Sequence, residues 1–147
     1  MNNLGILQWN CGKTTYGSSS ITLESLDFNT FKILVLQEHS SDLSKEIRAN
    51  KILNYRDLID KKEFTRVGFY ISKDITIYSL FKYSKDVQRL RISFNNRIIN
   101  IINIYNPINP SITIPKIAIW QDIKKALIDS KQEEIIVLGD FNLKHSL

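Results

Sequence analysis

The segment from residue 67 to residue 105 most constrains the fold, because short apolar runs alternate there with turn signals. Three of these runs predict successive strands: Val67–Ile71, Ile75–Leu80 and Leu90–Phe94. The pair Asn95-Asn96 then joins the third run to Arg97–Tyr105, which is typical of a β-hairpin. The sequence therefore predicts an antiparallel sheet across the middle of the chain.

Further strands, together with helices, are predicted on both sides of this antiparallel run. Apolar runs expected as buried strands are Leu4–Trp9, Phe31–Leu36 and Ile135–Leu138. Helices are expected at Ile21–Phe28, Ser41–Ala49 and Pro115–Ser130. In the last, apolar residues recur at helical spacing: Ile117, Trp120, Ile123, Leu127 and Ile128. This mixture predicts an α/β sandwich, and the absence of a repeat or linker predicts one domain over residues 1–147.

Composition favours a globular protein with a polyanionic partner. The apolar share is 43% and the aromatic share 10%, which a disordered chain would not reach. The net charge of +5 favours partners such as nucleic acid. A single cysteine, Cys11, fits a reducing compartment. With no signal peptide and no membrane-length apolar run visible, we expect an intracellular location, cytoplasmic or nuclear, without a membrane partner.

Polar side chains suited to a site follow four separate strand patterns: Asn10, Glu38, Tyr105 with Asn106, and Asp140 with Asn142. Strand ends that gather on one rim of a sheet bring distant residues together. Each residue also has an ordinary structural explanation. Glu38 could cap a loop or hold a hard cation, Asn10 could close its own turn, and Tyr105 could pack as an aromatic at a strand end. Their convergence favours a functional site.

The last thirteen residues pair a carboxylate with an amide at a strand end. Asp140 and Asn142 are two residues apart, so extended backbone would point both side chains to the same face. Such a pair suits a metal-bound phosphate, although a polar turn is the simpler explanation of the motif alone. His145, in the same loop, could be solvated or could bind an anion.

The ordered motifs resemble the endonuclease/exonuclease/phosphatase (DNase I-like) superfamily. They are Gln8-Trp9-Asn10, Leu36-Gln37-Glu38, Asn103-Ile104-Tyr105-Asn106-Pro107 and Gly139-Asp140-Phe141-Asn142. The first and last phrases are most similar to endonuclease domains of non-LTR (LINE-type) retrotransposons, which nick target DNA. The resemblance covers nearly the whole chain.

The resemblance implies a role for each site residue. Glu38 coordinates Mg²⁺ (or Mn²⁺), with Asn10 beside it in the metal and phosphate network. Tyr105 contacts the scissile phosphate, and Asn142 hydrogen-bonds it. Asp140 holds the attacking water or protonates the departing oxygen. His145 matches a histidine often found in the retrotransposon version of this loop.

Family members also end in a strand with Ser-Asp-His, whose histidine activates the attacking water, and this sequence has no such segment. His39 directly follows Glu38 and is expected to point elsewhere. We therefore expect the N-terminal portion of a four-layered α/β sandwich, incomplete at its C-terminus. The expected function is Mg²⁺-dependent cleavage of DNA with little activity alone. The alternatives are a non-catalytic retrotransposon remnant that binds nucleic acid or protein, and an enzyme acting on a phosphoinositide or sphingolipid.

Overall fold

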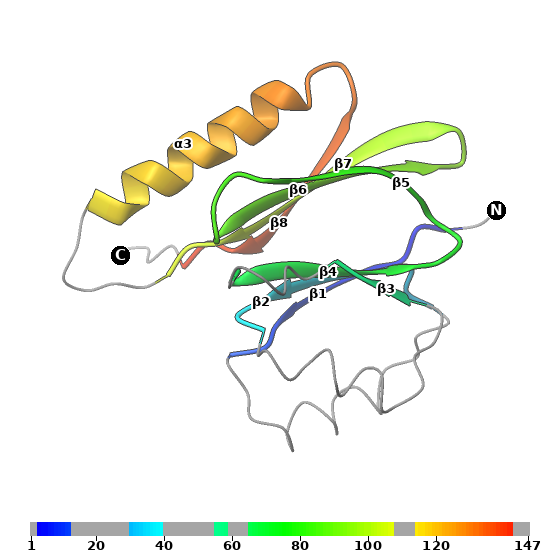
Figure 1. Cartoon of the computed structure of the whole chain (residues 1–147), viewed down its shortest axis with the longest axis horizontal. Coiled ribbons are helices and arrows are strands. Elements are labelled where there is room, and N and C mark those ends of the chain that lie inside the picture. The colour runs from blue at the N-terminus through cyan, green and yellow to red at the C-terminus, as the bar shows by residue number, and fades with distance from the viewer. Residues whose placement is uncertain (1–2, 13–29, 40–54, 59–64, 108–113, 143–147) are drawn as a thin grey trace, which may run out of the picture.

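Two four-stranded sheets stack against each other, and a helix covers the outer face of the second (Figure 1). The computed structural model describes residues 3–12, 30–39, 55–58, 65–107 and 114–142. The first sheet has the strand order β1-β2-β4-β3, and the second has the order β5-β6-β7-β8. The bounds are β1 Ile6–Asn10, β2 Ile33–Gln37, β3 Tyr55–Asp57, β4 Val67–Ser72, β5 Thr76–Lys82, β6 Val87–Phe94, β7 Arg97–Tyr105, α3 Ile114–Asp129 and β8 Glu134–Asp140.

The direction of the strands decides which residues meet at each edge. Strand β1 runs parallel to β2 with Trp9 opposite Leu36, and β7 runs parallel to β8 with Tyr105 opposite Asp140. Strands β4 and β6 run antiparallel to β2 and β7. The ends of β1, β2, β7 and β8 therefore lie near the beginnings of β4 and β6.

Aliphatic side chains from facing strands fill the space between the sheets. From the first sheet, Ile33 and Val35 of β2 and Phe69 and Ile71 of β4 are fully buried there. They meet side chains of β6 and β7: Leu90, Ile92, Ile99 and Ile101. Because side chains alternate along a strand, the β7 residues Ile102 and Ile104 face the other way and are buried under α3. Strand β7 is therefore buried on both faces, which explains its near-continuous apolar sequence.

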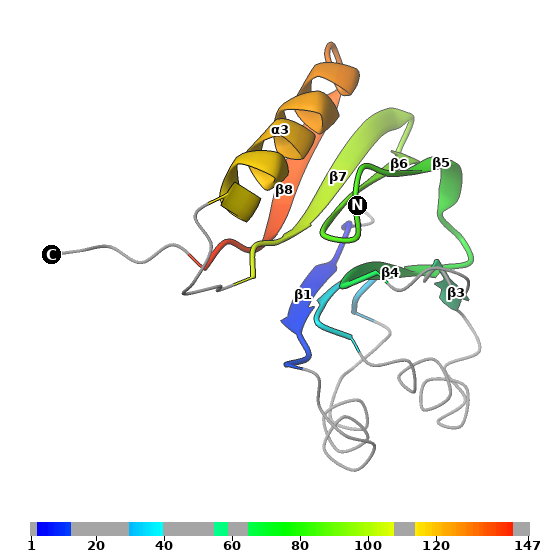
Figure 2. The same ribbon diagram turned by 60° about the vertical axis from the view of Figure 1, so that its left-hand side comes forward.

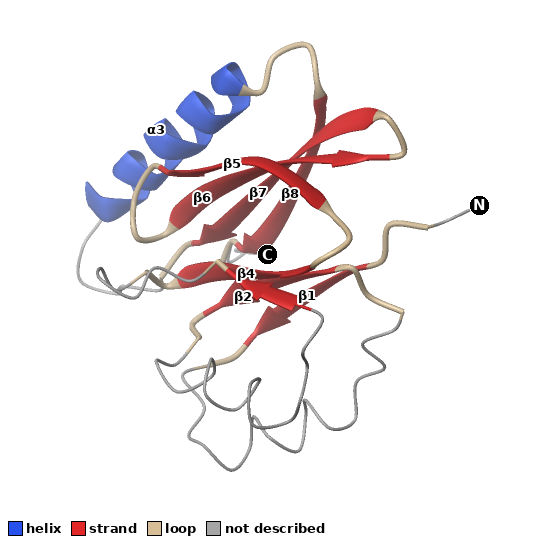
Figure 3. Cartoon of the chain, turned by 45° about the vertical axis from the view of Figure 1, so that its right-hand side comes forward, coloured by secondary structure: helices blue, strands red, loops and turns tan. Residues whose placement is uncertain are grey.

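Helix α3 packs on the outer face of the second sheet, as the rotated views show (Figures 2 and 3). Its buried residues Ile119, Ile123 and Ala126 contact Val87, Ile102 and Ile104. The predicted apolar stripe is wrong for three residues, since Trp120, Leu127 and Ile128 are all more than a third exposed. The helix contacts β6 and β7, and the β8 side chains Ile135 and Val137 on this side of the molecule remain exposed.

Most predicted elements of the described chain are confirmed. The strands agree within a few residues, and the α/β sandwich is the observed architecture. The hairpin also holds, with Asn95 (φ 50°) and Asn96 (φ 60°) both left-handed as a type I′ turn requires. The short strand β3 was not predicted. The helices predicted at 21–28 and 41–49 lie outside the described residues. No helix in the described part is long and apolar enough to cross a membrane.

Candidate active site

The ends of strands from both sheets bring four predicted site residues together. We call Asn10, Glu38, Tyr105 and Asp140 the strand-end rim. The side-chain nitrogen Nδ2 of Asn10 donates a hydrogen bond of 2.6 Å to Oδ2 of Asp140, which joins β1 to β8 across 130 residues of sequence. The phenol of Tyr105 and the carboxylate of Glu38 interact, which relates the end of β7 to the end of β2. The rim is therefore built by both sheets.

Strand β1 is held against β8 by a second contact, next to the rim. The side chain of Gln8 donates to the backbone oxygen of Gly139 at 3.1 Å and accepts from its N–H at 3.3 Å. Glycine is required at 139, because a Cβ atom there would lie 2.1 Å from the backbone oxygen of Ile104. The close approach of β8 to β7 thus places Asp140, the next residue, beside Asn10.

Glu38 occupies an unusual backbone conformation at the end of β2. Its φ of 47° is left-handed, a region that costs a non-glycine residue energy and is enriched at functional sites. Its N–H donates to the backbone oxygen of Arg66 at 2.7 Å, which fixes the turn against the beginning of β4. The carboxylate is half-buried and directed to the Tyr105 phenol.

Tyr105 is a protonated hydrogen-bond donor at neutral pH. Burial, and then the hydrogen bond to the Glu38 carboxylate, raise the pKa of the Tyr105 phenol. The guanidinium of Arg66 lies over the ring, 5.3 Å from its centroid, and is held in a two-pronged ion pair by Asp86. The backbone of Asp86 in turn accepts from the Tyr105 N–H at 2.9 Å. Arg66 and Asp86 together therefore hold Tyr105 in place.

The loops after β7 and β8 are tied together by asparagines. Asn106 Nδ2 donates to the backbone oxygen of Phe141 at 2.7 Å, and Asn142 Nδ2 donates to the backbone oxygen of Asn106 at 2.6 Å. The expectation that Asp140 and Asn142 sit on extended backbone is wrong. The φ of Asn142 is 44°, and its N–H bonds back to Oδ1 of Asp140 at 3.1 Å, so the chain turns there.

A buried polar contact fixes one sheet relative to the other just below the rim. Gln37 of β2 donates to Oδ1 of Asn103 of β7 at 2.7 Å, between the sheets. Asn103 also donates to the backbone oxygens of Leu36 and Gly68, at 3.0 Å each. Both amides are fully buried. Hydrogen bonds in such a dry environment hold their partners firmly.

The rim suits a hydrated hard cation better than a metal enclosed by protein ligands. Within the described ranges, no group of three or more His, Cys, Asp or Glu side chains is gathered to hold a metal ion. Mg²⁺ keeps several of its waters and is commonly bound through one or two carboxylates. Glu38 provides a carboxylate of that kind. The amide oxygen of Asn10 accepts a hydrogen bond from the Gly12 N–H at 2.9 Å, so Asn10 also closes its own turn, as the sequence allowed.

Of the two histidines, the structure describes His39 alone. His145 lies outside the described residues, so its role stays a prediction. His39 is 4% exposed, which keeps it from reaching a solvent-borne substrate. That it points away from the rim stays a prediction.

Sequence reasoning missed Arg66 and Asp86 because it considered only residues that follow strands. Both precede strands that run the opposite way, β4 and β6, so they arrive at the same rim. The position of Arg66 and Asp86, each a charged residue directly before an antiparallel strand, is the sequence signal that could have identified them.

Solved structures with similar folds share this architecture. TDP2 of D. rerio, in a complex with a single-strand DNA product, superposes with a TM-score of 0.76 at 14% identity, covering 97% of this chain and 62% of that chain. The endonuclease domain of TRAS1, a telomere-specific non-LTR retrotransposon, superposes with a TM-score of 0.69 at 14% identity. The match covers 98% of this chain and 61% of that chain. Beta toxin of Staphylococcus aureus superposes with a TM-score of 0.71 at 11% identity, and the match covers 99% of this chain and 68% of that chain.

These similarities establish the fold, which is DNase I-like. This chain spans less than two thirds of the TDP2 and TRAS1 structures. No protein-family model and no curated protein matches the sequence.

Proposed function

We propose that this chain is a phosphodiesterase domain, dependent on Mg²⁺ or Mn²⁺, that acts on the backbone of DNA. The observation that carries the proposal is the rim itself, where Asn10 bonds Asp140 and Tyr105 interacts with Glu38 at the ends of four strands. The likeness to a TDP2 structure with bound DNA product and to the TRAS1 endonuclease domain supports DNA as substrate. The net charge of +5 favours the same partner. A retrotransposon origin and an intracellular location, cytoplasmic or nuclear, are part of the proposal.

In this proposal Glu38 and Asn10 hold the cation. When bound, the cation neutralises the negative charge that grows on the phosphate oxygens during in-line displacement. Tyr105 donates a hydrogen bond to a phosphate oxygen, which its raised pKa allows because the phenol keeps its proton. Arg66 is a positioning residue that keeps the Tyr105 ring in place.

Asp140 and Asn142 act on the other side of the scissile bond. Asp140 holds the attacking water or protonates the departing oxygen, oriented by Asn10 and by the Asn142 N–H. The second hydrogen of the Asn142 amide donates to the phosphate, since the first is used by the backbone of Asn106. His145 binds the anion or positions this loop.

Turnover by this chain is expected to be slow, because the described part of the rim contains no histidine oriented by an aspartate to serve as the general base. Losing a positioned base typically costs about 10²–10⁴-fold in rate. A non-catalytic module that binds nucleic acid or protein is therefore the second candidate, and the burial of His39 favours it.

A plasmid-nicking assay tests the proposal. With Mg²⁺ we expect slow nicking at most, raised by added imidazole as an external base and raised further in a longer version carrying a Ser-Asp-His strand. Glu38→Gln and Asp140→Ala should abolish it, whereas the exposed helix variant Gln121→Ala should not.

Two results would contradict the account in different ways. If the longer version with an intact rim left the plasmid supercoiled, the phosphodiesterase proposal would fail. Equal nicking by both versions, abolished in each by Asp140→Ala, would show that the catalytic set assigned here is wrong.

A further inference from the structure

A second polar hollow lies on the outer face of the second sheet, beside the end of α3. Its volume is about 470 Å³, and we call it the outer groove. The residues that matter for its chemistry are Tyr78, Phe81, Arg89, Arg91, Lys131 and Glu133. Its Lys131 and Glu133 precede β8, whereas Asp140 of the rim ends that strand. Seven strand residues span roughly 20 Å, so the outer groove is separate from the rim.

A β-bulge creates the aromatic side of the outer groove. The register of β5 with β6 shifts between Ile77 and Ser79, so Tyr78 is an extra residue in the strand. Ile77 packs into the core between the sheets, while Tyr78, Ser79 and Phe81 line the outer groove. Strict alternation would put Ser79 and Phe81 on the same side as Ile77, and the bulge removes that constraint.

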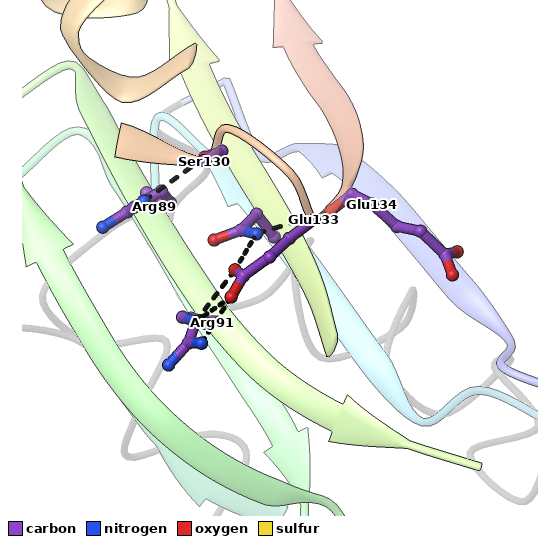
Figure 4. A network of polar contacts seen from close by, with 6 residues as sticks. Arg89, Arg91, Ser130, Glu133 and Glu134 are labelled. Carbon is purple, nitrogen blue, oxygen red and sulfur yellow. Dashed lines mark hydrogen bonds and ion pairs between the residues drawn. The ribbon is translucent and has the colours of Figure 1, made fainter. Parts of the chain in front are cut away.

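Guanidinium groups of β6 stack on these aromatic rings. Arg89 lies over Phe81 at 4.6 Å from the ring centroid, and Arg91 lies over Tyr78 at 5.1 Å. Figure 4 shows both arginines projecting from β6 toward the connection between α3 and β8. The outer faces of the rings stay accessible, since Tyr78 is 54% exposed and Phe81 46%.

The two arginines differ in how their charge is balanced. Arg91 forms a two-pronged ion pair with Glu133. Arg89 is only 5% exposed, and within the described residues it donates one hydrogen bond, of 3.3 Å to the hydroxyl of Ser130. Its buried Nε has no hydrogen-bond partner, and the described ranges provide no carboxylate at ion-pair distance.

A buried guanidinium with unused donors is costly unless an anion completes it. The nearby carboxylates are already engaged, since Asp129 accepts from the Tyr83 hydroxyl at 2.6 Å and Glu133 is bound by Arg91. Lys131 adds an exposed ammonium at the same place. Three cations, Arg89, Arg91 and Lys131, line the outer groove against two carboxylates, Asp129 and Glu133, so its formal net charge is +1.

We propose that the outer groove binds one nucleotide unit of a single-stranded nucleic acid. The phosphate lies against Arg89 and Lys131, and the base stacks on Tyr78. An anion next to exposed aromatic rings is the combination that a nucleotide presents, and single strands are commonly bound by such rings in a basic groove. Paired bases in a duplex would not be free to stack there. This site uses no residue of the strand-end rim, so it goes beyond the proposed nuclease function.

Fluorescence anisotropy with a labelled thymidine oligonucleotide of about 12 residues, in EDTA, tests the proposal. Tyr78→Ala should weaken binding about 5- to 100-fold, the range of one base-aromatic stack, and Tyr78→Phe should restore it. Lys131→Gln should weaken binding and lower the salt dependence by about 0.7 in log–log slope, one phosphate contact. Lys73→Gln, an exposed lysine in the turn between β4 and β5, is the matched control and should have no such effect.

An abasic strand of equal length separates the two contacts. Tyr78→Ala should not change its binding, while Lys131→Gln should weaken it. In the native protein, the NMR signal of the Arg89 Nε–H group should shift when the strand binds. The Arg89→Lys variant, which lacks this group, identifies the signal. Because Tyr78 and Lys131 are exposed, their variants are expected to fold even if an Arg89 variant does not.

Native affinity in both Tyr78→Ala and Lys131→Gln would overturn the proposal, as would an equal loss in Lys73→Gln. The exposed helix variant Gln121→Ala should bind the oligonucleotide as the native chain does. Failure of nicking with intact oligonucleotide binding would count against the nuclease function alone, and the reverse would count against the outer groove alone.

Discussion

At the scale of single residues, the pairing of Glu38 with Tyr105 decides which chemistry the rim can perform. A phenol beside a carboxylate keeps its proton, because ionisation would set two negative charges side by side. Tyr105 is therefore a donor rather than a base or nucleophile. The left-handed backbone at Glu38 and the stacked Arg66 both serve to maintain this pairing.

Replacement of Glu38 by glutamine should lower the pKa of the Tyr105 phenol toward the ordinary value of about 10. Burial would keep it somewhat above that value, since burial is the larger cause of the rise. The NMR shift of the tyrosine Cζ carbon followed against pH measures the change. A Tyr105 pKa unchanged in Glu38→Gln would mean that the two side chains do not interact, and the rim as described would be wrong.

At the scale of elements, Glu133 links three neighbouring strands at the outer groove. It precedes β8 and forms an ion pair with Arg91 of β6. It also accepts a hydrogen bond of 2.8 Å from the side-chain amide of Asn100 of β7. The hydrogen bonds from Arg91 and then from Asn100 lower the pKa of the Glu133 carboxyl from 4.5 to about 2. Since the folded state holds the charged form, this contribution to stability is present above pH 4.5 and is lost as pH falls toward about 2.

Glu133→Gln should therefore be less stable than the native chain at neutral pH, and the two should converge in free energy of unfolding between pH 4.5 and about 2. Urea denaturation across that range measures it. Glu134→Gln is the matched control, because Glu134 is exposed and pairs with the exposed Arg97. A stability difference that stays constant with pH would show that Glu133 acts through packing rather than charge.

The elements show where sequence reasoning succeeds and where it does not. Strand β7 and helix α3 were predictable because each is long, with 9 and 16 residues, and β7 is also a nearly continuous apolar run. Strand β3 has three residues and is defined by pairing with β4, which no local pattern reveals. The stripe on α3 was misjudged because propensity cannot tell which face of a helix meets the sheet. The turn at Asn142 depends on hydrogen bonds to Asp140 and Asn106, which become visible only in three dimensions.

At the scale of the whole molecule, the two sheets must keep a fixed relative position for the rim to exist. Asn10 and Glu38 come from the first sheet, and Tyr105 and Asp140 come from the second. Apolar packing between sheets is non-directional, so it tolerates sliding better than directed hydrogen bonds do. The fully buried hydrogen bond from Gln37 to Asn103 is directed in this way, so it fixes the relative position of the two sheets.

Asn103→Ala should lower the free energy of unfolding by about 2–4 kcal/mol, because it removes the partner of the buried Gln37 amide and one hydrogen bond from each of two buried backbone oxygens. Urea denaturation gives the value. Gln121→Ala, which removes an exposed amide from α3, should change stability by no more than about 0.5 kcal/mol. Equal effects of the two substitutions would show that the contact between the sheets is dispensable.

The most direct test of the central claim is a Mn²⁺ titration followed by NMR. We predict that paramagnetic broadening is centred on the rim, with the side-chain amide of Asn10 among the first signals lost. The same titration of Glu38→Gln should show the broadening greatly reduced, whereas Glu134→Gln should behave like the native chain. Broadening that persists unchanged in Glu38→Gln, or that centres on Glu133 and Glu134, would place the cation elsewhere and contradict the assignment of the rim as the active site.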